Sequence, residues 1–432
     1  MSDIVNLLVV EPSSNTSKHR AAAIFAHKEH RPDVESVREH LKEVRAYSRE
    51  HHGELLETLK KTFEHHGGVR VGVAADAAEA ASFIRKAAGE TTLASINKSN
   101  VVVNELRPHL HAAGLTTYLR YYTEFKNFGE TFQKKVEDYW SLPGMHGRGL
   151  VETFDVKKSM ASLASTEVRD YVAILSVNAI SAEDGSVFFL QHMSNISKDL
   201  DQARKIVLVV SLEKIVKDRE AALAHTQAMG VFGLESILLD LEPKDLEAYD
   251  FDALPILPGS PKREISVLIF DNGRSALPDG PYADLSLCID CRACARQCPI
   301  GQHTLLERAM VYSPKNYLLG FLQGWLPSTD ACLHCGRCEV ECPVDIDIPT
   351  LIWRAQLEHY EKHGRSLKKK MLDDPELLGK LGTLASPLSN WATSLPIVRW
   401  IMQLTTGVHT RANLPAFKRQ TFHDWYKREK HG

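Results

Sequence analysis

The sequence predicts an α/β domain with a largely parallel sheet, followed by an α-helical domain that holds two [4Fe–4S] clusters. Short apolar runs alternate with helical stretches between residues 69 and 260, which is typical of layered α/β structures. All eight cysteines fall into two copies of one spacing, C-x2-C-x2-C-x3-C-P, the spacing by which bacterial ferredoxins ligate such clusters. The segments between and after the two copies have the apolar spacing of helices.

The N-terminal segment, residues 1–68, is expected to be helical. Residues 31–66 are highly charged and are followed by two glycines at 67–68, which favours a long helix or a helix pair that ends there. Adjacent histidines stand at 51–52 and at 65–66. Because neighbouring residues do not share a helix face, a solvated surface is a better interpretation of these histidines than a metal site.

Residues 69–275 are expected to form the α/β domain. Its short apolar runs predict strands, and the amphipathic stretches between them predict helices, so the sheet should be largely parallel. Neither GxGxxG after a strand nor GxxxxGK[ST] occurs, which argues against binding of NAD or ATP. The predicted strands are residues 69–75, 91–97, 171–177, 186–191, 205–211 and 236–242, and the predicted helices are 77–89 and 104–114.

The two cysteine motifs predict the cofactor and its ligands. Three thiolates two residues apart can bind three irons of one cube from a tight loop, and in two-cluster ferredoxins the fourth cysteine serves the other cluster. The crossing would tie the two loops into one unit. The assignment is therefore Cys288, Cys291, Cys294 and Cys342 for cluster 1, and Cys332, Cys335, Cys338 and Cys298 for cluster 2.

Zinc sites and disulfides are weaker interpretations of these cysteines. A tetrahedral zinc site needs neither a third cysteine at the same spacing nor a proline after the fourth. Disulfides require an oxidising compartment, but the opening residues lack the basic region, apolar core and cleavage site of a secretory leader. We therefore expect a cytoplasmic protein with reduced thiols. No CxxC is followed by histidine, which excludes covalent haem.

Length and composition exclude other classes of protein. A chain of 432 residues with 44% hydrophobic residues is long enough for two or three domains with packed cores. The net charge of −3 argues against a nucleic-acid partner. No apolar run approaches the length of a membrane span.

Residues 276–365 are expected to form the helical ferredoxin domain, and residues 366–432 a helical C-terminal tail. The tail segment 388–404 is apolar, and core packing beside the clusters is preferred for it over a partner-subunit surface or a membrane contact. Helical spacing is found at residues 303–312, 316–325 and 350–364. The apolar residues expected to shield the clusters are Leu305, Leu306, Met310, Leu318, Phe321 and Trp325.

Several of these segments resemble a known family. Residues 171–191 and 201–218 resemble the core of the LUD domain of lactate utilization proteins, with Ala182-Glu183-Asp184-Gly185 at the family's turn and Glu213-Lys214-Ile215-Val216 at its later strand end. LIFDNGRSAL resembles the linker before the first cysteine motif, and LPAFKRQTFHDWY resembles the family's tail. The chain is thus similar, over most of residues 90–432, to lactate utilization protein B-type iron–sulfur proteins. It departs from them at Asp184, where threonine is usual, and in residues 118–169.

The resemblance implies both a fold and a function. The LUD domain would be similar in fold to NagB, ribose-phosphate isomerase (RpiA) and the CoA-transferases, fused to the helical ferredoxin domain. The chain would be a non-catalytic electron-transfer subunit that relays electrons through two clusters. Its partners would be a cysteine-rich dehydrogenase subunit and a second LUD protein, in a complex that oxidises L-lactate to pyruvate.

Other functions remain open at this point. The relay could serve a different dehydrogenase complex, or the clusters could act as structural staples or redox sensors. The LUD domain could also be an enzyme acting on an acyl-CoA or a sugar phosphate, with Glu183 as its base or nucleophile. An ordinary turn at Glu183 is the preferred interpretation, since a fold does not establish a function.

Two further polar groups are better explained by structure than by ligand binding. Asp271, Arg274 and Ser275 could bind an anion, but a turn with Arg274 paired to a carboxylate at the domain junction is preferred. Residues 98–100 lie between a predicted strand and a predicted helix, where anions can bind. A helix cap by Ser99 or its neighbour Asn100 explains them as well.

Overall fold

The structure is a computed structural model that describes residues 34–64, 69–119, 151–154, 168–190, 196–233, 257, 263–303, 310–366, 369–370, 374–414 and 416–431. It consists of two compact units, Met1–Ala355 and Gln356–Gly432. The first unit contains the sheets and all eight cysteines. The division into four domains at residues 68, 275 and 365 stays a prediction.

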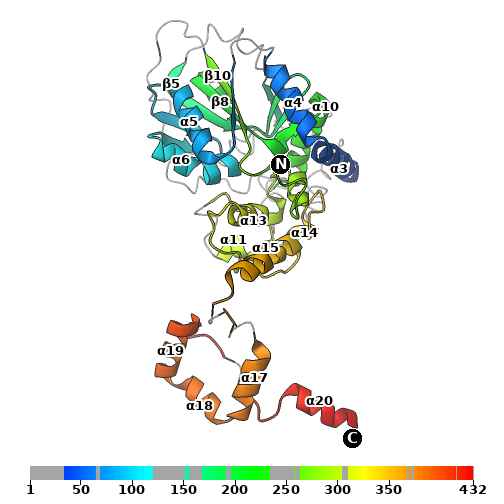
Figure 1. Cartoon of the computed structure of the whole chain (residues 1–432), viewed down its shortest axis with the longest axis vertical. Helices are drawn as coiled ribbons and strands as arrows, with labels where there is room; N and C mark the ends of the chain where they lie inside the picture. Colours follow the sequence, from blue (N-terminus) through cyan, green and yellow to red (C-terminus); the bar gives the residue numbers. More distant parts are fainter. Residues whose placement is uncertain are drawn as a thin grey trace, which may run out of the picture. The chain divides into compact units, whose positions relative to one another are not determined.

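A six-stranded parallel sheet forms the centre of the first unit (Figure 1). Every neighbouring pair in it runs parallel. The chain therefore crosses over between strands, and all carboxyl ends of the strands meet at one edge of the sheet. In spatial order the strands are β1 (Arg70–Ala74), β10 (Glu264–Phe270), β8 (Ala203–Ser211), β5 (Arg169–Ser176), β2 (Leu93–Ile96) and β3 (Thr116–Leu119).

Both faces of this sheet are buried. On β5, Tyr171, Ala173 and Leu175 face one core, which also contains Leu55, Leu59 and Phe63 of a helix that precedes the sheet. The alternate residues Val172 and Ile174 face a second core. That core is closed by α5 (Ala77–Ala88), the π-helical turn η1 (Val101–Leu106) and α6 (Arg107–Ala112). Because successive residues of a strand point to opposite faces of the sheet, the side chains alternate between two helical layers.

The structure confirms the α/β class and most of the predicted strands, with several differences. β10 was not predicted although it lies inside the sheet, and the short edge strand β3 was also missed. The predicted run 186–191 forms β7 (Val187–Leu190), which belongs to a second sheet. The predicted strand 236–242 lies outside the described residues.

A small mixed sheet stands beside the parallel one. Its four strands are β4 (Val151–Phe154), β7, β6 (Ala179–Ser181) and β9 (Ile215–Val216), in that order. The helix α10 (Arg219–Phe232) packs on it and is capped by Asp218, whose carboxylate accepts a hydrogen bond from the amide of Ala221 at 2.9 Å.

The predicted N-terminal helix pair is present as α3 (Val34–Glu50) and α4 (His52–Glu64). The adjacent glycines at 67–68 and the histidines at 65–66 lie outside the described residues. His51 stands where the two helices meet and stacks on Tyr47 at 4.2 Å between ring centroids. Among the described residues, no three histidine, cysteine, aspartate or glutamate side chains are grouped as around a single metal ion.

Short helices of the cysteine-containing region pack against the α/β part of the same unit. They are η7 (Ala283–Leu287), η8 (Ala293–Ala295), α11 (Pro299–His303), α13 (Pro314–Leu322), α14 (Arg337–Val340) and α15 (Ile348–His363). The predicted helical segments 316–325 and 350–364 correspond to α13 and α15. Residues 304–309, and with them Leu305 and Leu306, lie outside the described residues. We call residues 283–355 the cluster module.

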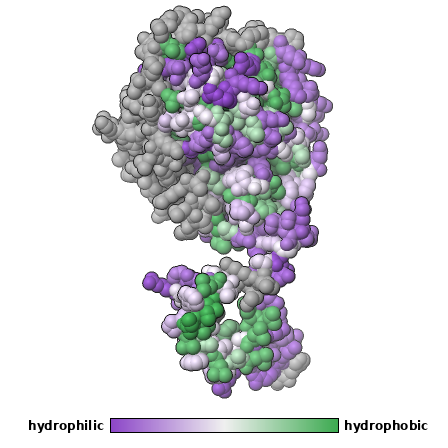
Figure 2. Space-filling view, turned by 60° about the vertical axis from the view of Figure 1, so that its left-hand side comes forward, coloured by the Kyte–Doolittle hydropathy of each residue, from purple (hydrophilic) through white to green (hydrophobic). Residues whose placement is uncertain are grey.

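The second unit, residues 356–432, contains α17 (Pro375–Leu384), α18 (Leu388–Ser394), α19 (Pro396–Thr406) and α20 (Phe422–His431). Apolar side chains gather on its surface (Figure 2). On α19 the exposed residues Ile397, Trp400, Ile401 and Leu404 recur at helical spacing and form one stripe. Within the part of the chain that the structure describes, helices long and apolar enough to cross a membrane are absent.

Candidate iron–sulfur site

The two cysteine loops share one backbone conformation. In the first loop Asp290 and Arg292 have positive φ angles of 61° and 59°, and in the second His334 and Gly336 have φ angles of 49° and 77°. These residues stand at equivalent positions after Cys288 and Cys332. Left-handed backbone is uncommon for residues other than glycine. Its repetition in the two loops indicates that both hold the same kind of group.

Each loop also directs a backbone amide at its first cysteine. The Asp290 N–H donates to Sγ of Cys288 at 3.3 Å. The His334 N–H donates in the same way to Cys332, where it lowers the thiol pKa against the larger, opposite effect of burial. Amide donors of this kind stabilise thiolates, and in iron–sulfur proteins they help to set the potential.

Four cysteines from both motifs border one cavity. Its lining includes Cys298 of the first motif together with Cys332, Cys335 and Cys338 of the second. Apolar and aromatic side chains, among them Tyr312, complete the wall. Cys298 therefore lies close to the first three cysteines of the second motif.

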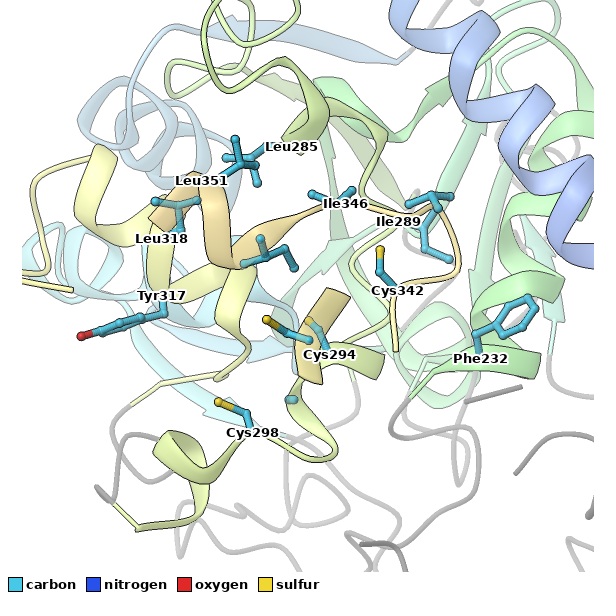
Figure 3. Close-up of a cluster of buried hydrophobic side chains, with 14 of the residues drawn as sticks. Phe232, Leu285, Ile289, Cys294, Cys298, Tyr317, Leu318, Cys342, Ile346 and Leu351 are labelled. Carbon is cyan, nitrogen blue, oxygen red and sulfur yellow. The ribbon is translucent and has the colours of Figure 1, made fainter. Parts of the chain in front are cut away.

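The other four cysteines influence one another. Burial raises the pKa of Cys294 well above its usual value, and the nearby Cys288, Cys291 and Cys342 raise it further, with a smaller effect from Cys338. Burial and then Cys288 raise the pKa of Cys291 to about 12. In Figure 3, Cys294, Cys298 and Cys342 lie among buried apolar residues that include Leu318.

The donor set fits two [4Fe–4S] clusters. All eight cysteines are free thiols, which is the number that two all-cysteine cubes require. Burial also raises the pKa of Cys338 to about 12 and that of Cys342 to about 11. Thiols with such pKa values lose their protons near neutral pH only when a metal stabilises the thiolates.

Two buried cations contact the first cysteine loop. Lys214 of η4 (Leu212–Lys214) is 3% exposed and donates from Nζ to the carbonyl of Ile289 at 2.6 Å. Arg45 of α3 donates from Nη2 to the carbonyl of Ser286 at 2.6 Å and from Nε to that of Leu287 at 3.2 Å. Burial lowers the pKa of Arg45 to about 10, so it stays charged at neutral pH.

A buried ionic network joins the α/β part to the cluster module. Arg274 follows β10 and pairs with Glu105 at 2.6 Å and with Glu213 at 2.8 Å. Burial alone would raise the pKa of Glu213, but Arg274 and two nearby lysines lower it to about 2. Gln323, which follows the last residue of α13, donates to Glu105 at 3.1 Å. The predicted pairing of Arg274 with a carboxylate is thus confirmed.

These contacts arise at the carboxyl edge of the parallel sheet. η4 follows β8, Arg274 follows β10, and η1 with Glu105 follows β2. In open α/β sheets, this edge is where ligands usually bind. In this chain the cluster module covers it.

Tyr312 contacts one cysteine directly. Its hydroxyl oxygen lies 3.0 Å from Sγ of Cys298. Burial, and then the neighbouring Cys298, raise the pKa of Tyr312. The phenol therefore stays protonated, and its O–H can donate a hydrogen bond to a thiolate.

One side of the second loop faces solvent. Cys335 is the exposed cysteine of the eight. Around it, Leu333 and Val340 are 66% and 62% exposed, and Trp353, which meets the ring of His334 edge-on, is 53% exposed. The second loop is thus more accessible than the first.

Glu183 lies on the exposed turn between β6 and β7. Its neighbour Asp184 accepts hydrogen bonds from the Ser186 amide at 3.0 Å and from the Ser186 hydroxyl at 2.8 Å, and Gly185 has a φ of 71°. These are ordinary turn contacts. Glu183 is absent from the lining of the cavity that the cysteines border, and a catalytic role for it stays a prediction.

The remaining polar candidates have structural partners. Asp271 accepts from the amide and the hydroxyl of Ser275 at 2.8 and 2.6 Å, after a turn in which Asn272 has a φ of 50°. Ser99 accepts from the amide of Val102 at 3.1 Å. The turn and the cap that the sequence favoured are both present.

Sequence reasoning missed Lys214, Arg45 and Tyr312 as neighbours of the cysteines. Lys214 stands within a segment quoted for its family resemblance, but nothing local relates it to a loop 75 residues away. Arg45 belongs to a highly charged helix in which the sequence singled out only the histidines. A signal for either could have come only from knowing how the elements pack.

Comparison with protein families matches residues 284–346 to the 4Fe-4S dicluster domain. The chain is 25% identical to lactate utilization protein B of Lysinibacillus sphaericus over 444 residues, which covers 93% of this chain and 90% of the relative. It is 28% identical to lactate utilization protein B of Bacillus cytotoxicus over 185 residues, or 39% of each chain. The protein of that name from Bacillus pumilus is 25% identical over 60% of this chain and 56% of its own length. No solved structure matches the chain.

These similarities extend along nearly the whole chain and agree with the resemblance found in the sequence. The chain is an iron–sulfur protein whose residues 284–346 match a dicluster domain that binds two [4Fe–4S] clusters. Its curated relatives carry the name lactate utilization protein B. Two of the three alignments span less than two thirds of the relative's own length.

Proposed function

We propose that this chain is the electron-transfer subunit of a lactate-utilization complex and relays single electrons through two interlocked clusters. The observation that carries the proposal is the cavity bordered by Cys298 together with Cys332, Cys335 and Cys338. It supports a crossed arrangement in which Cys298 completes the second loop's site. The mutual influence of Cys288, Cys291, Cys294 and Cys342 supports the complementary site.

Each cube, when bound, accepts and returns one electron at a time. The chain's own residues hold, shield and connect the cubes. Buried residues such as Leu318 and Ile346 exclude water from the thiols. The exposed surface around Cys335 is where we expect electrons to pass to or from another subunit, since electron transfer needs close approach. Its apolar neighbours Leu333 and Val340 suit contact with a protein.

The partners in this proposal are a cysteine-rich dehydrogenase subunit and a second LUD protein, and L-lactate is oxidised to pyruvate on the partner. The α/β part would have the LUD fold, similar to NagB, ribose-phosphate isomerase and the CoA-transferases. The parallel sheet with helices on both faces supports this assignment. The strand order in an experimental structure of the chain would test it.

The first test is the composition and activity of the purified chain. We expect about eight irons and eight sulfides per chain, reversible reduction, and no oxidation of lactate by the chain alone. Turnover of lactate by the isolated chain would contradict the relay role. Pull-down of the native complex followed by mass spectrometry should identify a cysteine-rich partner. A complex built around another dehydrogenase would leave the relay intact but change its substrate.

The crossed arrangement has its own test. Cys298→Ser should impair the cluster of the second loop, and Cys342→Ser that of the first. EPR spectra of the reduced variants should each lose one of the two signals. If Cys298→Ser instead abolishes the cluster held by Cys288, the ligands are not crossed.

A further inference from the structure

One peptide group in the first cysteine loop is engaged at both ends. It joins Ile289 to Asp290. Its N–H donates to Sγ of Cys288 at 3.3 Å, and its carbonyl accepts from Nζ of Lys214 at 2.6 Å. A cation at the carbonyl polarises the amide, so the N–H becomes a stronger donor to the sulfur. Lys214 therefore acts on the thiolate through a single peptide group.

The charge of Lys214 is placed where it has a large effect. The side chain is buried, and charge interactions are stronger in a medium of low dielectric constant. The nearby carboxylates have other cations: Asp290 pairs with Lys315 at 3.5 Å, and Glu213 with Arg274 at 2.8 Å. The charge of Lys214 is thus only partly offset by these carboxylates. Arg45 adds a second buried cation on the carbonyls of Ser286 and Leu287, directly before Cys288.

In the part of the chain that the structure describes, the second loop has no counterpart of the Lys214 contact. There the equivalent peptide group joins Leu333 to His334, and its N–H donates to Cys332. The side chain of Leu333 is 66% exposed, and within the described ranges no side chain donates to the Leu333 carbonyl. Two loops of the same backbone conformation therefore differ at this carbonyl: a buried lysine donates to it in the first loop, and among the described residues no side chain donates to it in the second.

We propose that Lys214 is a positioning residue that raises the reduction potential of the cluster held by the Cys288 loop above that of the cluster held by the Cys332 loop. Reduction adds one negative charge to a cube, and both a nearby cation and a stronger N–H donor favour the more negative state. An electron that enters at the exposed surface around Cys335 is then held preferentially by the cluster of the Cys288 loop. The inference rests on the proposed relay function.

The test is a potentiometric titration of the full chain followed by EPR. Lys214→Met removes the charge and the donor while keeping an unbranched side chain. We expect the ratio of reduced to oxidised cluster, measured at the wild-type midpoint, to fall about tenfold for one cluster, a shift of about 59 mV for a one-electron couple. The other cluster should titrate as in the wild type. Lys214→Arg should restore most of the potential.

Lys205→Met is the matched control. Lys205 lies on β8, the strand that precedes η4, and also donates from Nζ to a backbone carbonyl, that of Ala88, at 2.6 Å. That carbonyl belongs to α5, outside the cluster module. The control loses the same charge and the same type of hydrogen bond, and both potentials should stay unchanged.

The outcomes separate this inference from the proposed function. A protein without two reducible clusters would contradict the relay itself. Intact clusters whose potentials do not respond to Lys214→Met, or that fall together by the same amount, would refute the role of Lys214 alone. If Lys214→Met does not fold, Arg45→Met carries the test, because it removes the second cation from the same loop. Unchanged potentials in that variant would equally overturn the inference.

Discussion

At the scale of single residues, the hydroxyl of Tyr312 contacts a cysteine sulfur directly. It lies 3.0 Å from Sγ of Cys298, and the ring is almost completely buried. A hydrogen bond to a thiolate ligand withdraws charge from the cube and favours its reduced state. In the crossed arrangement this cube is the one held by the Cys332 loop.

Tyr312→Phe should therefore lower the potential of one cluster, and it should be the cluster that Lys214→Met leaves unchanged. Tyr317→Phe is the control, because Tyr317 is also buried beside the same cavity and its ring lies 6.3 Å from that of Tyr312. Potentiometric EPR would measure both variants. A shift on the same cluster in Lys214→Met and Tyr312→Phe would argue against the crossing.

Whether the role of a residue could be predicted from the sequence depends on whether its evidence is local in the chain. The cysteines could be predicted because a cluster loop imposes a spacing of two residues, which is local. Asp271 and Ser99 could be predicted because turns and caps are also local. Lys214 and Arg45 could not, since a buried cation near a thiolate is defined by tertiary packing.

At the scale of elements, the π-helical turn η1 connects the sheet to the cluster module. Asn104 on this turn donates to the carbonyl of Val311 at 3.1 Å and accepts from the Val311 amide at 2.8 Å. Both groups are buried. π-Helical turns are rare and often occur at functional sites. Here the turn places the side-chain amide of Asn104 so that it satisfies both backbone polar groups of Val311, the residue just before Tyr312.

Asn104→Ala should loosen the cluster module. Two buried backbone groups would lose their partners, at a cost of about 1–3 kcal/mol each. We expect faster release of iron to a chelator, followed by absorbance, together with a lower melting temperature. Asn97→Ala removes a similar pair of bonds, to the amide and carbonyl of Ser176 at 3.0 and 2.8 Å, but within the α/β part. Equal acceleration of iron release in both variants would contradict the role of η1.

The elements themselves were predictable where their pattern is distinct. Alternating strands and helices predicted the α/β class, and the helical spacing of residues 350–364 predicted α15, which begins at Ile348. β10 was missed although it is as apolar as β5 and β8, because its last residues, 268–270, were assigned to the linker before the first cysteine motif. β3 was missed because four residues carry little periodicity.

At the scale of the whole molecule, the described residues that bury the clusters all belong to the first unit. The buried core of the cluster module includes Leu351, Ile352 and Ala355 of α15 and ends there. The exposed stripe on α19 belongs to the second unit. The sequence could identify this stripe as apolar, but spacing alone cannot say which surface covers it.

Removal of residues 367–432 should leave both clusters in place. Iron and sulfide content and the EPR spectrum are expected to match those of the full chain, because α15 remains complete. A chain that ends at residue 347 is the comparison, since it also loses Ile348, Leu351 and Ile352 from the buried core, and it should bind less iron. Loss of iron from the chain that ends at residue 366 would instead place part of the cluster environment in the second unit.

The proposed pairing of Cys298 and Cys342 with the opposite loops would also have a consequence for biosynthesis. The second loop's set is complete only once Cys338 has been translated, and the first loop's set only with Cys342. Neither cube can therefore gain its last ligand while the nascent chain is still short of the second motif. A ribosome that stalls between the motifs would leave a chain with thiols for three corners of a cube. Such a chain would lack the fourth ligand of either cube.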